Sequence, residues 1–112
     1  MNINWRPLTS VHDIEAVIER SNTVPCLILK HSTRCPISSM AMRRLETSWD
    51  LTEESVETYY LDLIQYREVS NYIASEFGIR HESPQALLIK GGNCVHHASH
   101  LDINVNSVKA AA

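Results

Sequence analysis

The sequence predicts an α/β domain whose mixed sheet has four to five strands and carries helices on both faces. Segments with helical spacing of apolar residues alternate with short apolar runs over residues 11 to 90, as in strands joined by crossover helices. A glycine pair, Gly91-Gly92, then separates two strand-like runs and predicts an antiparallel hairpin. Parallel and antiparallel strands are therefore expected in one sheet.

Length and composition predict one domain over residues 1–112. Hydrophobic residues make up 44% of the 112-residue chain, which is enough for a packed core. The formal net charge is -3 and no basic stripe is present, so we expect no nucleic-acid partner. No run reaches the roughly 18 apolar residues of a membrane span, and the first ten residues lack the apolar core of a signal peptide. We therefore expect a cytoplasmic protein that has no membrane partner.

The N-terminal half predicts two helices on either side of a buried strand. Ser10 and Asp13 have the spacing of a capping box, and the apolar residues after them predict a helix over about 11–21. The apolar run at 24–29 predicts a central strand buried on both faces. Pro36 begins a helix that ends near residue 48, and before all of these a short edge strand is possible at residues 5–7. The expected buried face of that second helix comprises Ile37, Met40, Ala41, Leu45 and Trp49.

The C-terminal half predicts a strand, a helix, a hairpin and a last short helix. Residues 56–64 contain a strand with Tyr59, Leu61 and Leu63 on one side. Apolar spacing predicts a helix over about 69–77, and Gly78 is its expected C-terminal cap. The hairpin strands are expected at 85–90 and 94–98, and a weak helical pattern covers about 104–111.

Three cysteines, an odd number, argue against a disulfide framework. Cys26 and Cys94 fit small buried hydrophobes. Cys35 lies where a strand ends and a helix begins, so free amide hydrogens and the helix dipole favour its thiolate. Arg34 is adjacent, Lys30 and His31 are close in sequence, and the hydroxyl of Ser38 is a further candidate donor. The alternative is a cysteine that merely occupies the helix N-cap.

Two motifs carry a resemblance to a known family. Cys35-Pro36-Ile37-Ser38 lies where the thioredoxin superfamily has its Cys-x-x-Cys or Cys-x-x-Ser motif, and Ser83-Pro84 lies where it has its cis-proline. The order of elements resembles the thioredoxin fold over nearly the whole chain. The string KHSTRCPIS, residues 30–38, resembles the signature of the YtxJ-type monothiol bacilliredoxins, which are linked to the low-molecular-weight thiol bacillithiol.

The resemblance implies a monothiol thiol–disulfide oxidoreductase that removes bacillithiol, or a similar thiol, from proteins. Cys35 would be the nucleophile, and Ser38 would stand in place of the resolving cysteine. Arg34, Pro36, Ser83 and Pro84 would bind the substrate. The implied partners are S-bacillithiolated proteins and a low-molecular-weight thiol, with bacillithiol as co-substrate and no bound cofactor or metal.

Other functions remain open from the sequence. One is an iron–sulfur carrier like the monothiol glutaredoxins, although these have Cys-Gly-Phe-Ser where this chain has Pro36 and Ile37 after the cysteine. Another is a non-catalytic adaptor that binds peptides beside Ser83-Pro84. Cys94 is also a candidate distant resolving cysteine for Cys35.

Two clusters of polar residues are expected to be solvated surface. Cys94, His96, His97 and His100 are metal-ligand types, but on a regular strand Cys94 and His96 would share one face and His97 the other, so solvated histidines are favoured. Glu53, Glu54 and Glu57 are expected on a solvated surface. Trp49, Tyr59 and Tyr60 are expected to pack in or near the core.

Overall fold

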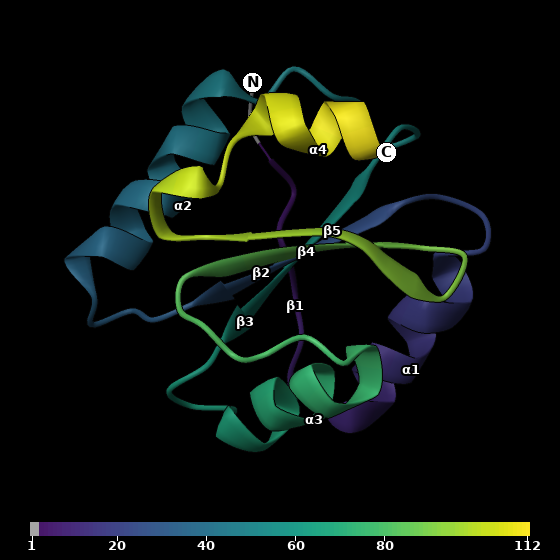
Figure 1. Cartoon of the computed structure of the whole chain (residues 1–112), viewed down its shortest axis with the longest axis horizontal. Coiled ribbons are helices and arrows are strands. Elements are labelled where there is room, and N and C mark those ends of the chain that lie inside the picture. The colour runs from purple at the N-terminus through teal and green to yellow at the C-terminus, as the bar shows by residue number, and fades with distance from the viewer. Residues whose placement is uncertain (1–2) are drawn as a thin grey trace.

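The computed structural model describes residues 3–112 and shows a five-stranded mixed sheet between two pairs of helices (Figure 1). The strand order is β1-β3-β2-β4-β5. β1, β3 and β2 are mutually parallel, whereas β4 is antiparallel to β2 and β5 is antiparallel to β4. The strands are β1 (Arg6–Pro7), β2 (Cys26–His31), β3 (Glu57–Asp62), β4 (Gln85–Lys90) and β5 (Asn93–Ser99). The predicted mixed sheet is confirmed, with β1 as the short edge strand.

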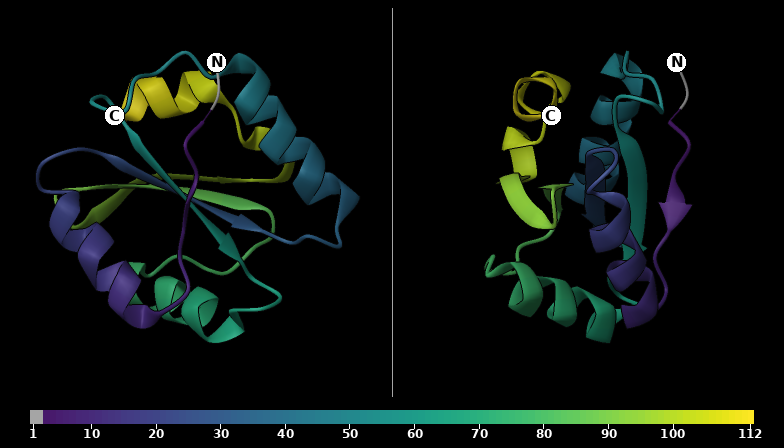
Figure 2. Two further views of the ribbon diagram at one scale, coloured as in Figure 1. Left: turned by 180° about the vertical axis from the view of Figure 1, so that it is seen from behind. Right: turned by 90° about the vertical axis from the view of Figure 1, so that its right-hand side faces the viewer.

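Helices cover both faces of this sheet (Figure 2). α1 (Val11–Arg20) and α3 (Arg67–Phe77) lie on one face, and α2 (Pro36–Ser48) and α4 (Val105–Ala111) lie on the other. A 3-10 turn at His100–Asp102 joins β5 to α4. In the part of the chain that is described, no helix is long and apolar enough to cross a membrane.

The central strand β2 supplies both hydrophobic cores. Cys26 and Ile28 pack with α1 and α3, whereas Leu27 and Leu29 pack with α2 and α4. All six residues of β2 are buried, because neighbouring strands flank it and helices cover both of its faces. The strand runs two residues further than the sequence predicts, so its last two residues are buried although they are polar.

The N-cap of α1 and the C-cap of α3 are the predicted residues, but the capping box of α1 differs in one hydrogen bond. The Ser10 hydroxyl caps α1 by accepting the Asp13 amide at 3.1 Å, but the Asp13 carboxylate accepts the amide of Thr9 at 2.9 Å. The reciprocal half of the capping box therefore lies one residue earlier than expected. Gly78 ends α3 in the left-handed conformation with φ of 66°, as predicted.

The predicted buried face of α2 is partly wrong. Ile37 and Met40 are 49% and 52% exposed, whereas Ser38, Ala41 and Leu45 are buried. Residues spaced three and four apart form one face of a helix, and the set that contacts the sheet begins at Ser38. The two exposed apolar side chains therefore lie on the surface of α2, close to its N-terminal end.

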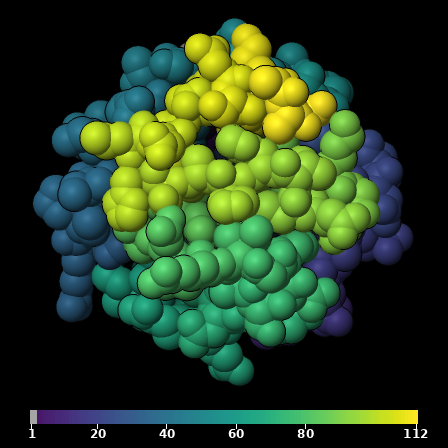
Figure 3. Space-filling model, viewed as in Figure 1, coloured from purple at the N-terminus to yellow at the C-terminus, as the bar shows by residue number. Residues whose placement is uncertain are grey.

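The predicted side-chain alternation in the second hairpin strand is also wrong. β5 crosses the middle of one face of the molecule (Figure 3). Leu88 pairs with His96 and Ile89 with Cys94, so Val95 is an extra residue in a β-bulge. Paired residues share a face, and Ile89 and Leu88 belong to different cores. The bulge thus places Cys94 and His96 on opposite faces, and residues 3–112 contain no group of three or more potential metal ligands.

The expectation of a fully solvated acidic cluster fails at one residue. Glu57 is buried, and its carboxylate accepts hydrogen bonds from Arg20 at 2.7 Å and from the Tyr59 hydroxyl at 2.8 Å. Glu53 is exposed and pairs with Arg6 at 2.7 Å. Glu57 begins β3 beside the central strand, so its position in the sheet determines its burial.

Candidate active site

Cys35 occupies the point where the chain leaves β2 and enters α2. It is the N-cap of α2, with an extended backbone. Its amide donates to the Ser32 carbonyl at 3.1 Å, and its own carbonyl accepts the Ser39 amide at 3.1 Å. The side chain is half-buried and Arg34 and Pro36 on either side are exposed. The free amides and positive dipole end of the 13-residue helix therefore lie next to an accessible thiol.

The predicted proline segment lies at the same end of the sheet. The Ser83–Pro84 peptide bond is cis, which is the isomer that the resemblance implies. Gln85 pairs with Lys30, so Pro84 precedes β4 beside the end of β2 from which the Cys35 loop departs. The Pro84 carbonyl accepts the His100 amide at 3.1 Å, which ties this segment to the turn after β5. The structure therefore brings together the residues to which substrate binding was assigned; their roles stay predictions.

Ser38 does not make the hydrogen bond to Cys35 that the sequence suggested. Its side chain is fully buried, and its Oγ lies 2.7 Å from Nδ1 of His31. The same oxygen accepts the backbone amide of Ser32 at 2.9 Å. The Cys35 side chain makes no capping hydrogen bond. Ser38 thus contacts the loop that carries Cys35 rather than the thiol itself.

Lys30 and His31 both contact polar groups other than the thiol. Lys30 Nζ lies 3.2 Å from the Ser70 carbonyl of α3 and 3.2 Å from Nδ1 of His81. Burial lowers the pKa of Lys30 to about 8. The exposed side chain of Arg34 is therefore the basic group best placed to approach an anion at Cys35.

Neither of the other two cysteines lies near Cys35. Cys26 and Cys94 both pair across to Ile89, and this row lies at the opposite end of β2 from the Cys35 loop. Four residues of strand from Cys26 to Lys30 span about 13 Å, and Cys35 lies beyond that. Cys94 therefore cannot resolve Cys35 in this fold. Burial also raises the pKa of Cys94, and raises that of Cys26 to about 11, which suppresses both thiolates.

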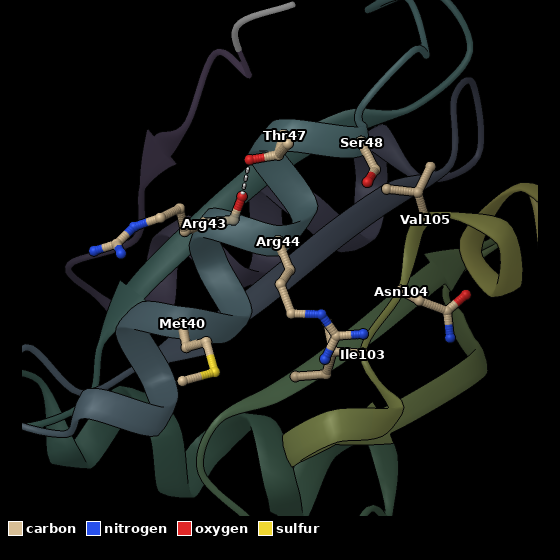
Figure 4. A pocket seen from close by; sticks show the side chains of 8 residues that line it. All are labelled: Met40, Arg43, Arg44, Thr47, Ser48, Ile103, Asn104 and Val105. Atoms are coloured by element: carbon tan, nitrogen blue, oxygen red, sulfur yellow. Dashed lines mark hydrogen bonds between the residues drawn. The ribbon is translucent and has the colours of Figure 1, made fainter.

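A cavity of about 270 Å³ adjoins the other flank of α2 (Figure 4). It lies between α2 and residues 103–105, and the lining begins at Met40 without including Cys35. Arg44 extends across it and its Nη1 donates to the Leu101 carbonyl at 3.4 Å, whereas Arg43 points away (Figure 4). The cavity is a separate feature from the surface that presents Cys35.

Sequence reasoning missed a buried polar cluster behind the proline segment. Lys30, Ser70 and His81 form part of it, and the Gln85 side chain donates to the Arg80 carbonyl at 2.9 Å. The Gln85 Oε1 atom is buried without a partner in the described chain. One signal in the sequence could have revealed this cluster: the apolar strand ends in Lys30-His31. Strands buried on both faces rarely contain such residues, so polar partners for them were to be expected.

Comparisons with known proteins agree with this geometry. The family model described as "Monothiol bacilliredoxin BrxC" matches residues 6–108. A solved structure described as a proposed oxidoreductase with a thioredoxin fold is 39% identical, with a TM-score of 0.81 over 95% of this chain and 91% of that chain. The thioredoxin of Malassezia sympodialis is 18% identical, with a TM-score of 0.74 over 98% and 89%. The thioredoxin of Fasciola hepatica is 20% identical, with a TM-score of 0.70 over 94% and 93%. The last two similarities show the fold alone.

Proposed function

This chain belongs to the monothiol bacilliredoxin family and is a thiol–disulfide oxidoreductase with a thioredoxin-like fold, and from that premise we propose that it removes bacillithiol from protein cysteines through Cys35. The observation that carries the proposal is the position of Cys35, an accessible thiol at a helix N-terminus with no second cysteine nearby. The substrate class would be proteins whose cysteine is capped by bacillithiol. Bacillithiol would be the co-substrate, with no bound cofactor.

The proposed cycle has two exchange steps. The Cys35 thiolate attacks the bacillithiol sulfur of the protein mixed disulfide, and the substrate cysteine leaves as a thiolate. Cys35 then carries bacillithiol in a mixed disulfide of its own. A second molecule of bacillithiol attacks that disulfide, which releases Cys35 as a thiolate and forms the symmetric bacillithiol disulfide. In the net reaction one free bacillithiol is consumed, the substrate cysteine is reduced, and the cap leaves as half of the bacillithiol disulfide.

The external thiol is needed because the molecule supplies no internal one. Cys26 and Cys94 lie at the far end of the sheet, and position 38 is a serine whose hydroxyl is already hydrogen-bonded. The oxidised form should therefore persist as a mixed disulfide until a thiol arrives. A reducing compartment such as the cytoplasm, where low-molecular-weight thiols are kept reduced, suits this cycle.

We further propose that Arg34 and the Ser83-Pro84 segment bind the substrate on either side of Cys35. Arg34 is exposed beside the thiol and can attract an anionic group on the capped substrate. Ser83 is half-buried and precedes Gln85, the first paired residue of β4, so its backbone can pair with an extended peptide. Pro36 would shape the same surface.

The test uses one substrate protein prepared with bacillithiol or with glutathione on a single cysteine. Wild type, Cys35→Ala and Cys94→Ala are each incubated with both substrates, and mass spectrometry follows the release of the cap. We expect wild type and Cys94→Ala to acquire the bacillithiol mass on Cys35, and Cys35→Ala to be inactive. Equal release by Cys35→Ala would reject the mechanism and favour the adaptor, whereas equal rates with both caps would reject bacillithiol specificity.

A further inference from the structure

The buried contact between His31 and Ser38 is a feature that the thiol chemistry alone does not require. His31 ends β2, and Ser38 lies in the first turn of α2, so the contact spans the loop that carries Cys35. His31 is 8% exposed and Ser38 is 0% exposed. Two buried polar groups need partners, and each supplies one to the other at 2.7 Å.

The hydrogen-bond pattern around Ser38 indicates which imidazole nitrogen carries the proton. The Ser38 oxygen accepts the Ser32 amide at 2.9 Å, and His31 Nδ1 is its other polar partner in the described chain. A hydroxyl has one hydrogen and two lone pairs, so an Nδ1–H donor would leave the buried Ser38 hydrogen without an acceptor, whereas a bare Nδ1 accepts it. The imidazole is then neutral, with its proton on Nε2.

The charged groups around His31 are consistent with a neutral ring. Burial lowers the pKa of His31 below its ordinary 6.5, and this effect outweighs the carboxylates of Asp62 on β3 and Glu46 on α2, which act in the opposite direction. At neutral pH the ring can therefore accept the Ser38 hydroxyl. Protonation of Nδ1 would reverse the bond, because the Ser38 oxygen would then accept from Nδ1 and its own buried hydrogen would lose its acceptor.

We propose that His31 and Ser38 are positioning residues that together hold the loop 32–35, and with it the Cys35 thiol, in the geometry needed for attack. Ser32 is bound twice in this arrangement, because its amide donates to Ser38 and its carbonyl accepts the amide of Cys35. The chain from His31 through Ser32 to Cys35 is thus fixed to the first turn of α2. The serine at position 38 acts here as a hydrogen-bonding link in the loop rather than as a substitute for a thiol.

This inference rests on the proposed function only in taking Cys35 as the attacking thiol. Attack on a disulfide needs the sulfur aligned with the scissile bond, and small misplacements of a reacting group are costly in rate. A purely structural contact would lower stability while leaving the reaction rate of the folded molecule unchanged. Reaction rate and stability must therefore be measured on the same variants.

The experiment begins with the wild-type protein. Long-range nitrogen–proton NMR correlations at pH 7.5 report which imidazole nitrogen carries the proton, and we expect His31 to be protonated on Nε2 with Nδ1 bare. Detection of a proton on Nδ1, alone or together with one on Nε2, would overturn the proposal. This measurement needs no variant and is independent of whether bacillithiol is the true cap.

The variants then test the consequence for Cys35. Ser38→Ala removes the hydroxyl, His31→Gln places its amide where Nε2 lies, and His31→Asn places its amide where Nδ1 lies. We expect Ser38→Ala and His31→Gln to react with a glutathione-capped model peptide about tenfold more slowly, and His31→Asn to stay within about threefold of wild type. Ser75→Ala, an exposed serine of another helix, serves as the matched control.

Different results would overturn the positioning role of His31 and Ser38 and the proposed function of Cys35. Rates of Ser38→Ala within about twofold of wild type, or equal rates for His31→Gln and His31→Asn, would overturn the positioning role. Unfolding free energies, measured alongside, show whether a slow variant is folded. An active Cys35→Ala protein would instead reject the proposed function and leave the imidazole tautomer unaffected.

Discussion

Replacing Lys30 with methionine should remove a pH dependence of stability that this chain owes to one buried ammonium group. Lys30 is fully buried between β2 and α3, and it faces a carbonyl and a histidine rather than a carboxylate. Burial lowers its pKa from 10.5 to about 8 in the folded chain. A difference of this size corresponds to about 3 kcal/mol of destabilisation while the lysine is charged.

The sign follows from proton binding. Between about pH 8 and pH 10.5 the folded chain has released the Lys30 proton and the unfolded chain still holds it, so stability rises with pH. The rise from pH 8 to pH 9 should be about 1 kcal/mol. Above pH 9 Cys26 opposes it, because its pKa is raised from 9.0 to about 11 on folding. The window from pH 8 to pH 9 therefore isolates Lys30 best.

Urea unfolding of wild type, Lys30→Met and Lys90→Met at pH 7, 8 and 9 provides the assay. Lys90 is an exposed lysine at the end of the neighbouring strand, so its replacement controls for the loss of charge. We expect Lys30→Met to be more stable than wild type at pH 7 by about 1–3 kcal/mol and to show no rise from pH 8 to pH 9. A Lys30→Met protein that keeps the rise, or that is less stable than wild type at pH 7, would refute the reasoning.

Three further predictions concern other parts of the molecule. Cys94→Ser should leave the rate of bacillithiol removal unchanged within about twofold, because Cys94 lies at the opposite end of the sheet from the nucleophile; a tenfold loss would contradict this. Lowering the pH from 6.5 to 5.5 should reduce the unfolding free energy, because burial lowers the pKa of His31 and His81 in the folded chain and the unfolded chain binds more protons. Replacing His81 with asparagine should reduce that decrease, and an unchanged pH profile would argue against it. Gly78→Ala should cost about 1 kcal/mol in urea unfolding through its φ of 66° alone, because no atom lies within 4 Å of the added methyl group; a stabilised variant would refute this.

Much of the fold could be predicted because its signals are local. The apolar spacing in α1 and α3, Pro36 at the start of α2 and the glycine pair before β5 each act over a few residues. The β-bulge at Val95 has no comparable signal, because the register shift is decided by the pairing of two strands. The same limit applies to Glu57, which is buried by its place beside the central strand and there meets Arg20, 37 residues away in sequence.

The candidate site also combines features that have local sequence signals with features that only the tertiary structure sets. The Cys35-Pro36 step predicts a thiol at a helix start, and the structure places it there. The partners of the neighbouring polar residues could not be predicted, because hydrogen bonds depend on distances across the fold. His31 and Ser38 are seven residues apart and meet only because α2 turns back over the end of β2.

The sequence by itself determined the order of elements, the single cysteine at a helix start and the family of oxidoreductases to which the chain belongs. Only the tertiary structure decided that Cys94 is too distant to resolve Cys35, that Lys30 faces α3 and that Ser38 bonds to His31. The physical reason is that local propensity and motif act along the chain, whereas burial, pairing register and hydrogen-bond partners are set by which segments the fold brings into contact.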